Sequence, residues 1–235
     1  MPDPSYVHSV FSAIAERYVT ANHVLSWGTD ISWRQRALQI IAEWKPGNLL
    51  DIATGTGDLA LAIEDALPET EVLGTDFCRA MLDVAERRGL RRTLEADAMH
   101  LPLQDASFDA ATVAFGLRNM ADYPAALREF RRVLKPGGHL LVLDFSMPEG
   151  VFAAPYRLYL HHVLPRLAGW VTGHPGAYAY LGDSIEAFPR GEAFLQLLRQ
   201  AGYAHPRHIP LSMGIAAIYT AEAGKCTMYN VQCSN

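Results

Sequence analysis

The sequence predicts an α/β fold in which helices cover both faces of a mostly parallel sheet. Three segments predict it: residues 48–60, 71–76 and 92–98 each contain a short apolar run with an acid at its end. Runs of this length fit buried strands and are too short for helices. Apolar residues at helical spacing follow the first run. Strand and helix therefore alternate, as they do in a parallel sheet with crossover helices.

The first segment carries a glycine turn between its strand and its helix. Asp51 is followed by Gly55 and Gly57, and Ala60 stands where a dinucleotide-binding motif has its third glycine. Glycines let the backbone approach a ligand, and the start of the helix offers unpaired N–H groups. Asp51 would repel the pyrophosphate of NAD but attract the ammonium group of S-adenosylmethionine. The motif therefore favours S-adenosylmethionine, and a glycine turn that binds nothing is the alternative. The expected contacts come from Asp51, Thr54, Gly55, Thr56 and Gly57.

The next two segments supply further acids at strand ends. Asp76 lies 19 residues after Gly57, where a carboxylate accepts hydrogen bonds from both ribose hydroxyls of a bound cofactor. Phe77 and Met81 follow it and are placed to pack against an adenine ring. Asp97 ends the third run and suits the amino group of the adenine. Each acid can instead cap the helix behind it. Because acids end three successive strands, helix capping is the less favoured explanation for the three acids taken together.

Composition limits the class of protein. A chain of 235 residues fits one domain, with or without a cap, and its formal net charge of −5 gives no overall attraction to nucleic acid. No apolar run approaches the length that spans a membrane, and the N-terminus lacks the basic and apolar parts of an export signal. The three cysteines neither imply a disulfide framework nor show metal-ligand spacing. We expect a soluble, cytoplasmic protein without a metal site.

Two segments flank the region that carries the glycine turn. The N-terminal helices are interpreted either as a packing layer or as a lid that places Tyr18, Trp27 and Trp33 near a substrate entrance. The second segment is rich in aromatic residues and is broken by prolines; it fits a cap for a flat apolar substrate, or an ordinary core. Residues 225–235 lack arginine and read as an atypical tail. We divide the single domain 1–224 into a helical lid (1–45), a cofactor-binding half (46–146), a cap insertion (147–190) and a C-terminal helix with two strands (191–224).

Two later strands lead to candidate catalytic residues. Residues 110–115 read as a strand that is followed by Arg118 and Asn119, and residues 139–145 read as a buried strand that contains Asp144. Ligands of open α/β sheets bind at the carboxyl ends of the strands, so all three side chains are expected at the same site. The other role open to Arg118 is an ion pair with an acid at the end of the sheet. The Lys135–Gly138 stretch reads as the stop of the intervening helix.

Several motifs resemble those of the ubiquinone/menaquinone biosynthesis C-methyltransferases, the UbiE family. The glycine turn and the Lys-Pro-Gly-Gly stretch are common to many methyltransferases, whereas Phe-Gly-Leu-Arg-Asn and the spacing between the last two motifs are more specific. The resemblance covers residues 7–222. The motifs are Val10–Ala15, Leu49–Asp58, Phe115–Asn119, Arg132–Gly138, Leu141–Ser146, His162–Pro165 and Tyr178–Ile185.

The resemblance implies a Rossmann-like class I methyltransferase fold with seven strands and S-adenosylmethionine as cofactor, with S-adenosylhomocysteine as product. It carries the cofactor contacts of the family to Thr56, Asp76, Asp97 with Ala98, and Ala114. The chain departs from the family at Ala114, where serine is frequent, and also at Val19, where an acid is frequent, and Asp144, where glutamate is frequent. Loss of a serine hydroxyl removes one hydrogen bond, worth about 1 kcal/mol, and leaves the cofactor assignment in place.

The activity that the resemblance implies is methylation of a ring carbon of a demethylated prenyl quinol. In such a reaction Arg118 would stabilise a phenolate oxygen and Asn119 would orient it, and Asp144 or a histidine of the insertion would accept a proton. Methylation of another aromatic or lipid acceptor, at oxygen for instance, and a non-catalytic cofactor-binding protein are the alternatives. Prenyl quinols are found in membranes, so transient contact with a membrane surface is also implied, and a homodimer is left open. The candidate histidines are His161, His162 and His174.

Overall fold

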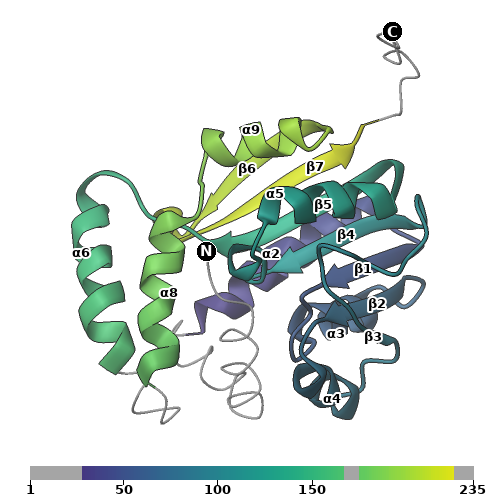
Figure 1. The fold of residues 1–235 in the computed structure, drawn as a ribbon, viewed down its shortest axis with the longest axis horizontal. Helices are drawn as coiled ribbons and strands as arrows, with labels where there is room; N and C mark the ends of the chain where they lie inside the picture. The colour runs from purple at the N-terminus through teal and green to yellow at the C-terminus, as the bar shows by residue number, and fades with distance from the viewer. Residues whose placement is uncertain (1–27, 167–174, 225–235) are drawn as a thin grey trace, which may run out of the picture.

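The computed structural model describes residues 28–166 and 175–224, and within them seven strands form one sheet (Figure 1). The strand order is β3-β2-β1-β4-β5-β7-β6, and in this sheet only β7 runs antiparallel to its neighbours. The predicted seven-stranded, mostly parallel sheet is therefore confirmed. The strands are β1 (Asn48–Ile52), β2 (Glu71–Asp76), β3 (Thr93–Glu95), β4 (Phe108–Ala114), β5 (Leu134–Phe145), β6 (Tyr203–Leu211) and β7 (Ala216–Ala223).

Helices cover both faces of the sheet because the central strands β1, β4 and β5 bury side chains on both sides. On one face, apolar residues of α5 and α9 pack against the sheet, among them Phe130 and Phe194. On the other face, α2 and α3 contribute Ile41 and Ile63. None of the described helices combines the length and the apolar character needed to cross a membrane. These helices are α2 (Thr29–Trp44), α3 (Asp58–Ala66), α4 (Arg79–Arg87), α5 (Tyr123–Val133), α6 (Ala153–Leu158), α8 (Pro175–Ala187) and α9 (Glu192–Gln200).

Short helical segments connect several of these elements. The 3₁₀ turn η1 follows β4, and the π-helix η3 continues α6 inside the insertion. Figure 1 shows α6 and α8 standing side by side at one end of the sheet. The insertion therefore sits beyond the carboxyl end of β5 as a separate helical layer. The bounds of the short segments are η1 (Leu117–Asn119), η2 (Gly150–Phe152), η3 (Tyr159–Val163) and η4 (Ser212–Gly214).

The order of the strands fixes where a ligand fits. From β1 the chain proceeds to β2 and β3 on one side, and then returns to place β4 and β5 on the other side. The helices behind β1 and β4 consequently lie on opposite faces, which leaves a crevice at the carboxyl ends of these two strands. The glycine turn follows β1 and η1 follows β4, so both predicted site segments line this crevice.

The structure differs from the sequence-based expectation at the start of β5. Residues 135–138, which were expected to form the stop after a helix, lie inside β5. Leu134 already pairs with Phe108, and a register shift then carries the pairing to Ala110 and His139. The positive φ of 81° at Gly137 allows the strand to make this irregular step. The proline and the two glycines of this stretch indicated a turn in the sequence, but in the sheet they form a bulge.

Some residues singled out from the sequence lie outside the described part of the chain. The described part of the expected lid is α2, which buries Trp33 and Ile41 against the sheet. This half of the segment therefore packs against the sheet, and the choice between a packing layer and a lid stays open. The predictions outside the described residues concern the stretch before residue 28 with Tyr18 and Trp27, His174 in the insertion, and the tail 225–235.

Candidate active site

Two connected cavities occupy the crevice between β1 and β4. The first runs along the glycine turn, and the second, of about 250 Å³, lies toward the loop after β3. They share Ala53, Asp76, Phe77, Gly116 and Asn119. A molecule with an amino-acid end, a sugar and a flat ring fits such an elongated cleft. The first cavity is also lined by Arg34, Asp51, Thr54, Gly55, Thr56, Asp58, Leu59, Met81, Ala114 and Phe115, and the second by Thr75, Ala96, Asp97, Ala98, Met99, Met120 and Ala121.

The glycine turn has the geometry that its sequence predicts. Gly55 and Gly57 have positive φ values of 56° and 82°, and the Gly57 amide donates to the Thr54 carbonyl at 2.9 Å. A Cβ at Gly57 would lie 3.1 Å from the Cβ of Ala85, whereas a Cβ at Gly55 would meet no atom within 4 Å. Gly57 therefore allows close packing against α4, and Gly55 leaves open space for a ligand.

Asp51 is a buried carboxylate at the floor of the first cavity. Its two oxygens accept hydrogen bonds of 2.6 Å, one from the Thr54 hydroxyl and one from the Thr112 hydroxyl. Burial raises the pKa of Asp51 to about 6, although both hydroxyls and the nearby charge of Arg34 act in the opposite direction. No lysine or arginine pairs directly with this acid among the described residues, so a bound ammonium group would supply the missing positive charge.

Asp76 lies where the two cavities meet. One oxygen accepts a hydrogen bond of 2.8 Å from the Gly55 amide, and the other accepts one of 2.9 Å from the Cys78 amide. These bonds fix the carboxylate across the cleft. Phe77 is partly exposed and lines both cavities, while Met81 is almost fully buried below the first one.

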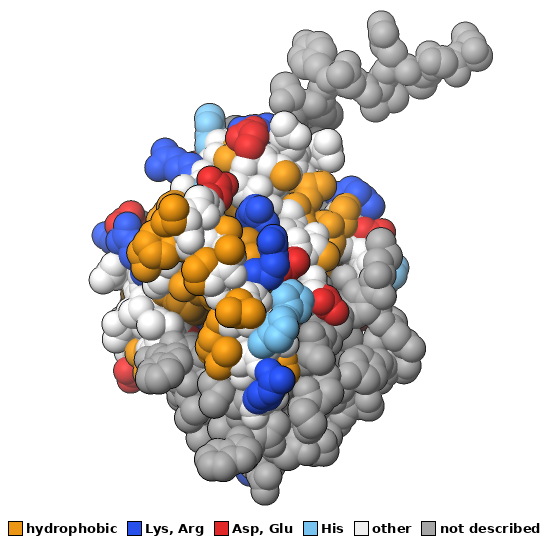
Figure 2. Space-filling view, turned by 90° about the vertical axis from the view of Figure 1, so that its left-hand side faces the viewer, with side chains coloured by type: hydrophobic (Ala, Val, Ile, Leu, Met, Phe, Trp, Pro, Cys, Tyr) orange, Lys and Arg blue, Asp and Glu red, His pale blue; other side chains and the backbone are white. Residues whose placement is uncertain are grey.

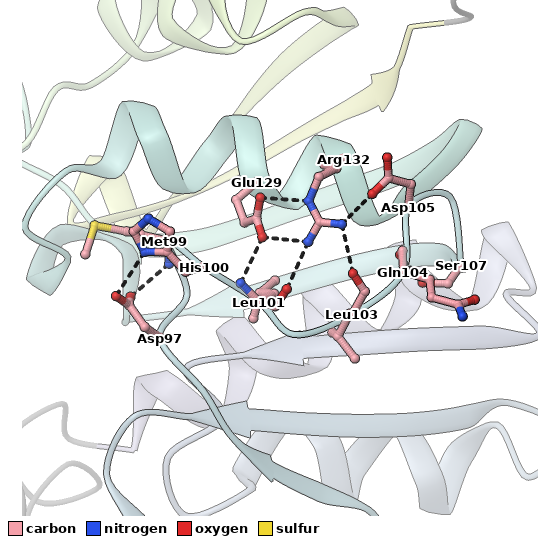
Figure 3. Close-up of polar contacts among 10 residues, drawn as sticks. All are labelled: Asp97, Met99, His100, Leu101, Leu103, Gln104, Asp105, Ser107, Glu129 and Arg132. Atoms are coloured by element: carbon pink, nitrogen blue, oxygen red, sulfur yellow. Dashed lines mark hydrogen bonds and ion pairs between the residues drawn. The ribbon is translucent and has the colours of Figure 1, made fainter.

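The loop after β3 closes the second cavity and is held in place by α5. Figure 3 shows Arg132 of α5 between Glu129 and Asp105, with its guanidinium donating to the Leu101 and Leu103 carbonyls. These two bonds measure 3.0 and 2.8 Å. The arginine thus ties the whole loop to one helix. The hydrogen bond from Arg132 lowers the pKa of Glu129, whose carboxylate also accepts from the Leu101 amide.

The start of the same loop carries Asp97 to the rim of the cavity. An oxygen of Asp97 accepts a hydrogen bond of 2.9 Å from the Met99 amide, which orders the turn (Figure 3). About half of the Asp97 side chain is exposed. Ala98 and Met99 form the apolar wall beside it. An acid next to an apolar slot is an arrangement that suits the amino edge and the faces of an adenine ring.

Arg34 is a site residue that the sequence did not single out. From α2 it pairs with Asp30 one turn away, lies 3.6 Å from Asp58 at the start of α3, and has its guanidinium 5.4 Å from the centre of the Phe115 ring. It lines the first cavity opposite Asp51. Arg34 and Asp51 together place a cation and an anion at one end of the cleft, as the carboxylate and ammonium groups of an amino acid require.

Arg118 and Asp144 form a buried ion pair behind the cleft. The guanidinium donates to an Asp144 oxygen at 2.6 Å and to the Phe115 carbonyl at 2.6 Å, and it lies 5.1 Å from the centre of the Phe145 ring. Its Nε has no hydrogen-bond partner among the described residues. Neither residue lines the two cavities, whereas Asn119 lines both. The ion-pair alternative for Arg118 is therefore present in the structure, and the catalytic roles remain predictions.

The insertion contacts η1, the turn that carries Arg118, through α8. Burial raises the pKa of the Tyr156 hydroxyl well above its usual value, and the positive charge of Arg118 opposes this rise. His161 is held by acids of α8, with 3.1 Å to Glu186 and 3.8 Å to Asp183. His162 is exposed, and neither histidine lines the cleft.

Two residues at the strand ends have an unusual backbone. Ala53 after β1 and Phe115 after β4 have positive φ values of 51° and 60°, a conformation that non-glycine residues rarely adopt. Such strain collects at functional sites, where the surrounding structure enforces it. A Cβ at Gly116 would lie 2.6 Å from the Cβ of Ala53, so the two strand ends touch where the cavities meet.

Comparison with known proteins agrees with this geometry. The model of the ubiE/COQ5 methyltransferase family matches residues 2–223. The demethylmenaquinone methyltransferase of Thermus thermophilus is 49% identical over 219 residues, covering 91% of this chain and 99% of that protein. The one from Deinococcus radiodurans is 44% identical over 222 residues, covering 92% of each.

A solved structure supports the fold. A methyltransferase from Thermotoga maritima, described as S-adenosylmethionine-dependent and as a possible histamine N-methyltransferase, superimposes with a TM-score of 0.69 at 21% identity. The superposition covers 92% of this chain and 99% of that one. At this identity the likeness shows the class I fold alone. Together with the family model and the two relatives, it confirms the fold class predicted from the sequence, and the chain belongs to the ubiE/COQ5 methyltransferase family.

Proposed function

We propose that this protein transfers the methyl group of S-adenosylmethionine to a ring carbon of a demethylated prenyl quinol. One observation carries the choice of substrate: the relative named demethylmenaquinone methyltransferase is 49% identical over 99% of its own length. The structure contributes a cleft whose charged groups fit the cofactor. Its aromatic-rich insertion provides a neighbouring layer for a flat, apolar acceptor.

The cofactor would lie along the two cavities. Asp51 would hold its ammonium group and Arg34 its carboxylate, while Asp76 would accept hydrogen bonds from the ribose hydroxyls. Asp97 and Ala98 would contact the adenine. When bound, S-adenosylmethionine supplies an electrophilic methyl group on a sulfonium. Thr54, Thr56 and Ala114 also line the first cavity, which supports the contacts proposed for them.

The acceptor ring would lie between Asn119 and the insertion. Loss of a proton from the ring hydroxyl pushes electron density onto the neighbouring carbon, and we assign the positive charge of Arg118, which lies buried behind the cleft, to stabilising the phenolate oxygen. Asn119 would orient that oxygen. Both oxygens of Asp144 already accept from Arg118 or from the Phe145 amide, so we assign Asp144 to positioning the guanidinium. Proton transfer would then fall to a water molecule or to a histidine of the insertion.

A methyl-transfer assay tests this proposal. The purified protein is incubated with S-adenosylmethionine and a short-chain demethylmenaquinol analogue, in reduced and oxidised form side by side. We expect a ring-methylated product from the reduced form only, because only the quinol yields a phenolate. Product mass with fragmentation separates carbon from oxygen methylation. No product from either form, with tight S-adenosylhomocysteine binding demonstrated, would refute the substrate and keep the cofactor.

Two expectations about association go with this function. A prenyl quinol resides in the bilayer, so we propose that the enzyme contacts the membrane surface during turnover. The homodimer that the sequence left open remains a prediction. Sedimentation of the purified chain over a range of concentrations tests it: a mass of twice 25.9 kDa is the expected value for a dimer.

A further inference from the structure

The outer surface of the insertion has an unusual composition. Residues 151–166, which run through η2, α6 and η3, expose only apolar and basic or imidazole side chains, and no acid stands at any exposed position of this described segment. Val151 is 83% exposed and Leu158 is 59% exposed. We call this surface the cap face. Its exposed residues are Val151, Phe152, Ala154, Pro155, Arg157, Leu158, His162, Val163 and Arg166.

The opposite side of the same segment is also apolar, and it is buried. Leu160 and Leu164 pack with Met147 and Ile185 in a small core of the insertion. A surface helix normally has one apolar stripe and one charged side, and a helix that is apolar on all sides is normally covered. A contiguous exposed apolar surface marks a contact with a protein or a membrane. The cap face therefore has the composition of a surface that is covered during function.

The charges next to the cap face select the kind of partner. Arg157 lies at its edge and pairs with Glu186 of α8 at 2.8 Å, and Arg166 donates to the His162 carbonyl. Figure 2 looks at the end of the molecule where α6 lies, and it shows hydrophobic side chains gathered there with basic, histidine and a few acidic side chains around them. Apolar residues flanked by cations are typical of helices that lie in the interface of an anionic bilayer.

The cap face is close to the end of the cleft where the acceptor is expected. The π-helix η3 contacts α8, and α8 contacts η1, the turn that carries Arg118 and Asn119. One helical layer thus separates the cap face from the candidate catalytic residues. A substrate that leaves the bilayer at this face has only this layer to pass.

We infer that the cap face docks on the surface of an anionic phospholipid bilayer, with Val151 and Leu158 in the interface and Arg157 and Arg166 beside the lipid phosphates. The inference rests on the proposed function, because a prenyl quinol gives the enzyme a reason to visit the membrane. On the membrane, the docked insertion leaves one helical layer between the bilayer and η1.

Co-sedimentation of the full chain with vesicles tests this inference. The vesicles are phosphatidylcholine alone, or phosphatidylcholine with phosphatidylglycerol. We expect binding to the anionic vesicles, and a loss of about tenfold or more in the double variant Val151→Glu, Leu158→Glu. The matched control is Ile31→Glu, which changes a 47% exposed apolar residue on α2 and is expected to bind like the unaltered protein. Arg157→Gln and Arg166→Gln should each weaken binding to the anionic vesicles about fivefold and leave binding to neutral vesicles unchanged.

Activity measurements separate this inference from the proposed function. The double variant should methylate a water-soluble quinol analogue at the normal rate but lose activity toward a long-chain quinol embedded in vesicles. Equal vesicle binding by the double variant and the unaltered protein would overturn the inference. So would a change of the double variant from dimer to monomer in sedimentation, which would make the cap face a contact between two copies. Vesicle binding that depends on the cap face, without methylation of any quinol, would refute the function and leave the docking surface in place.

Discussion

Replacing Asp51 by asparagine is expected to make the cofactor-free protein more stable and its cofactor binding weaker. In the folded protein the pKa of Asp51 is raised by burial from 3.8 to about 6, so at neutral pH folding places a charge where it is poorly solvated. The difference in pKa corresponds to about 3 kcal/mol. A neutral asparagine avoids this cost.

The hydrogen bonds that Asp51 accepts make the stabilisation of the Asp51→Asn variant smaller than this value. Thr54 and Thr112 both donate to Asp51, and the amide nitrogen of an asparagine cannot accept, so one hydroxyl has to reverse its hydrogen bond. Allowing about 1 kcal/mol for the disturbed bond leaves a gain of about 2 kcal/mol in the free energy of unfolding. For a protein of this size the gain corresponds to an increase in Tm of about 4–8 °C.

The pH dependence follows from the same shift. Between pH 4 and about 6 the folded protein binds more protons at Asp51 than the unfolded chain does, so this group lowers the free energy of unfolding as the pH rises through that interval. Above pH 6 the destabilisation of the folded state by the charged Asp51 is fully present. Asp51→Asn should lack this part of the pH dependence. S-adenosylhomocysteine should bind the variant about 10- to 100-fold more weakly, because a charge-assisted contact with its ammonium group is lost.

Thermal unfolding and titration calorimetry check both effects. Asp109→Asn is the matched control, since its carboxylate has the opposite shift: burial alone would raise the pKa of Asp109, but the hydrogen bonds from Lys135 at 2.6 Å and from the Asn48 amide at 2.8 Å lower it. That variant should lose stability and keep its cofactor affinity. An Asp51→Asn protein that melts at or below the Tm of the unaltered one, without cofactor, would refute the account of Asp51.

Three further substitutions test other parts of the site. Arg118→Lys should lower kcat by at least about tenfold with little change in S-adenosylhomocysteine affinity, because lysine lacks the planar group; an equal loss of both would reject the catalytic role. Arg132→Met should lower the free energy of unfolding, measured with urea, by about 3 kcal/mol, because Glu129 loses its partner. The amide hydrogens of the loop beside Asp97 should also exchange faster. Unchanged exchange would contradict the role of Arg132 in holding this loop to α5. Arg34→Gln should weaken S-adenosylhomocysteine binding about tenfold yet leave adenosine binding unaltered, a difference that competition assays measure.

The sequence predicted the sheet and the cofactor side of the cleft because both depend on local patterns. Acids at the ends of parallel strands come together once the strands pair, so Asp51, Asp76 and Asp97 all line the crevice, and their contacts with a cofactor stay a prediction. Arg34 was missed for the opposite reason. A helix presents its residues in all directions, and nothing local in the 29–44 stretch tells which of its charged residues faces the end of β1. Only the packing of α2 on the sheet decides that.

Contacts between distant segments explain why the sequence did not show the burial of the Arg118–Asp144 pair or the early start of β5. Arg118 and Asp144 were both expected at the carboxyl edge of the sheet. Their burial, and the 2.6 Å between a guanidinium nitrogen of Arg118 and a carboxylate oxygen of Asp144, depend on the contact of η1 with β5. The early start of β5 has a similar origin, because the pairing of Leu134 with Phe108 overrides the local turn preference of the residues that follow. Such contacts depend on tertiary structure and cannot be predicted from a short stretch of sequence.

The contact between Ala53 and Gly116 has a consequence for how this family can vary. Any side chain at 116 would need the space that the methyl group of Ala53 fills, while a glycine at 53 would free that space and adopt the positive φ without strain. The two positions are therefore expected to change together across related sequences: where 116 is not glycine, 53 should be. Two residues that are 63 positions apart in the sequence are thus expected to vary as a pair, because the space at this point of the crevice holds only one Cβ atom.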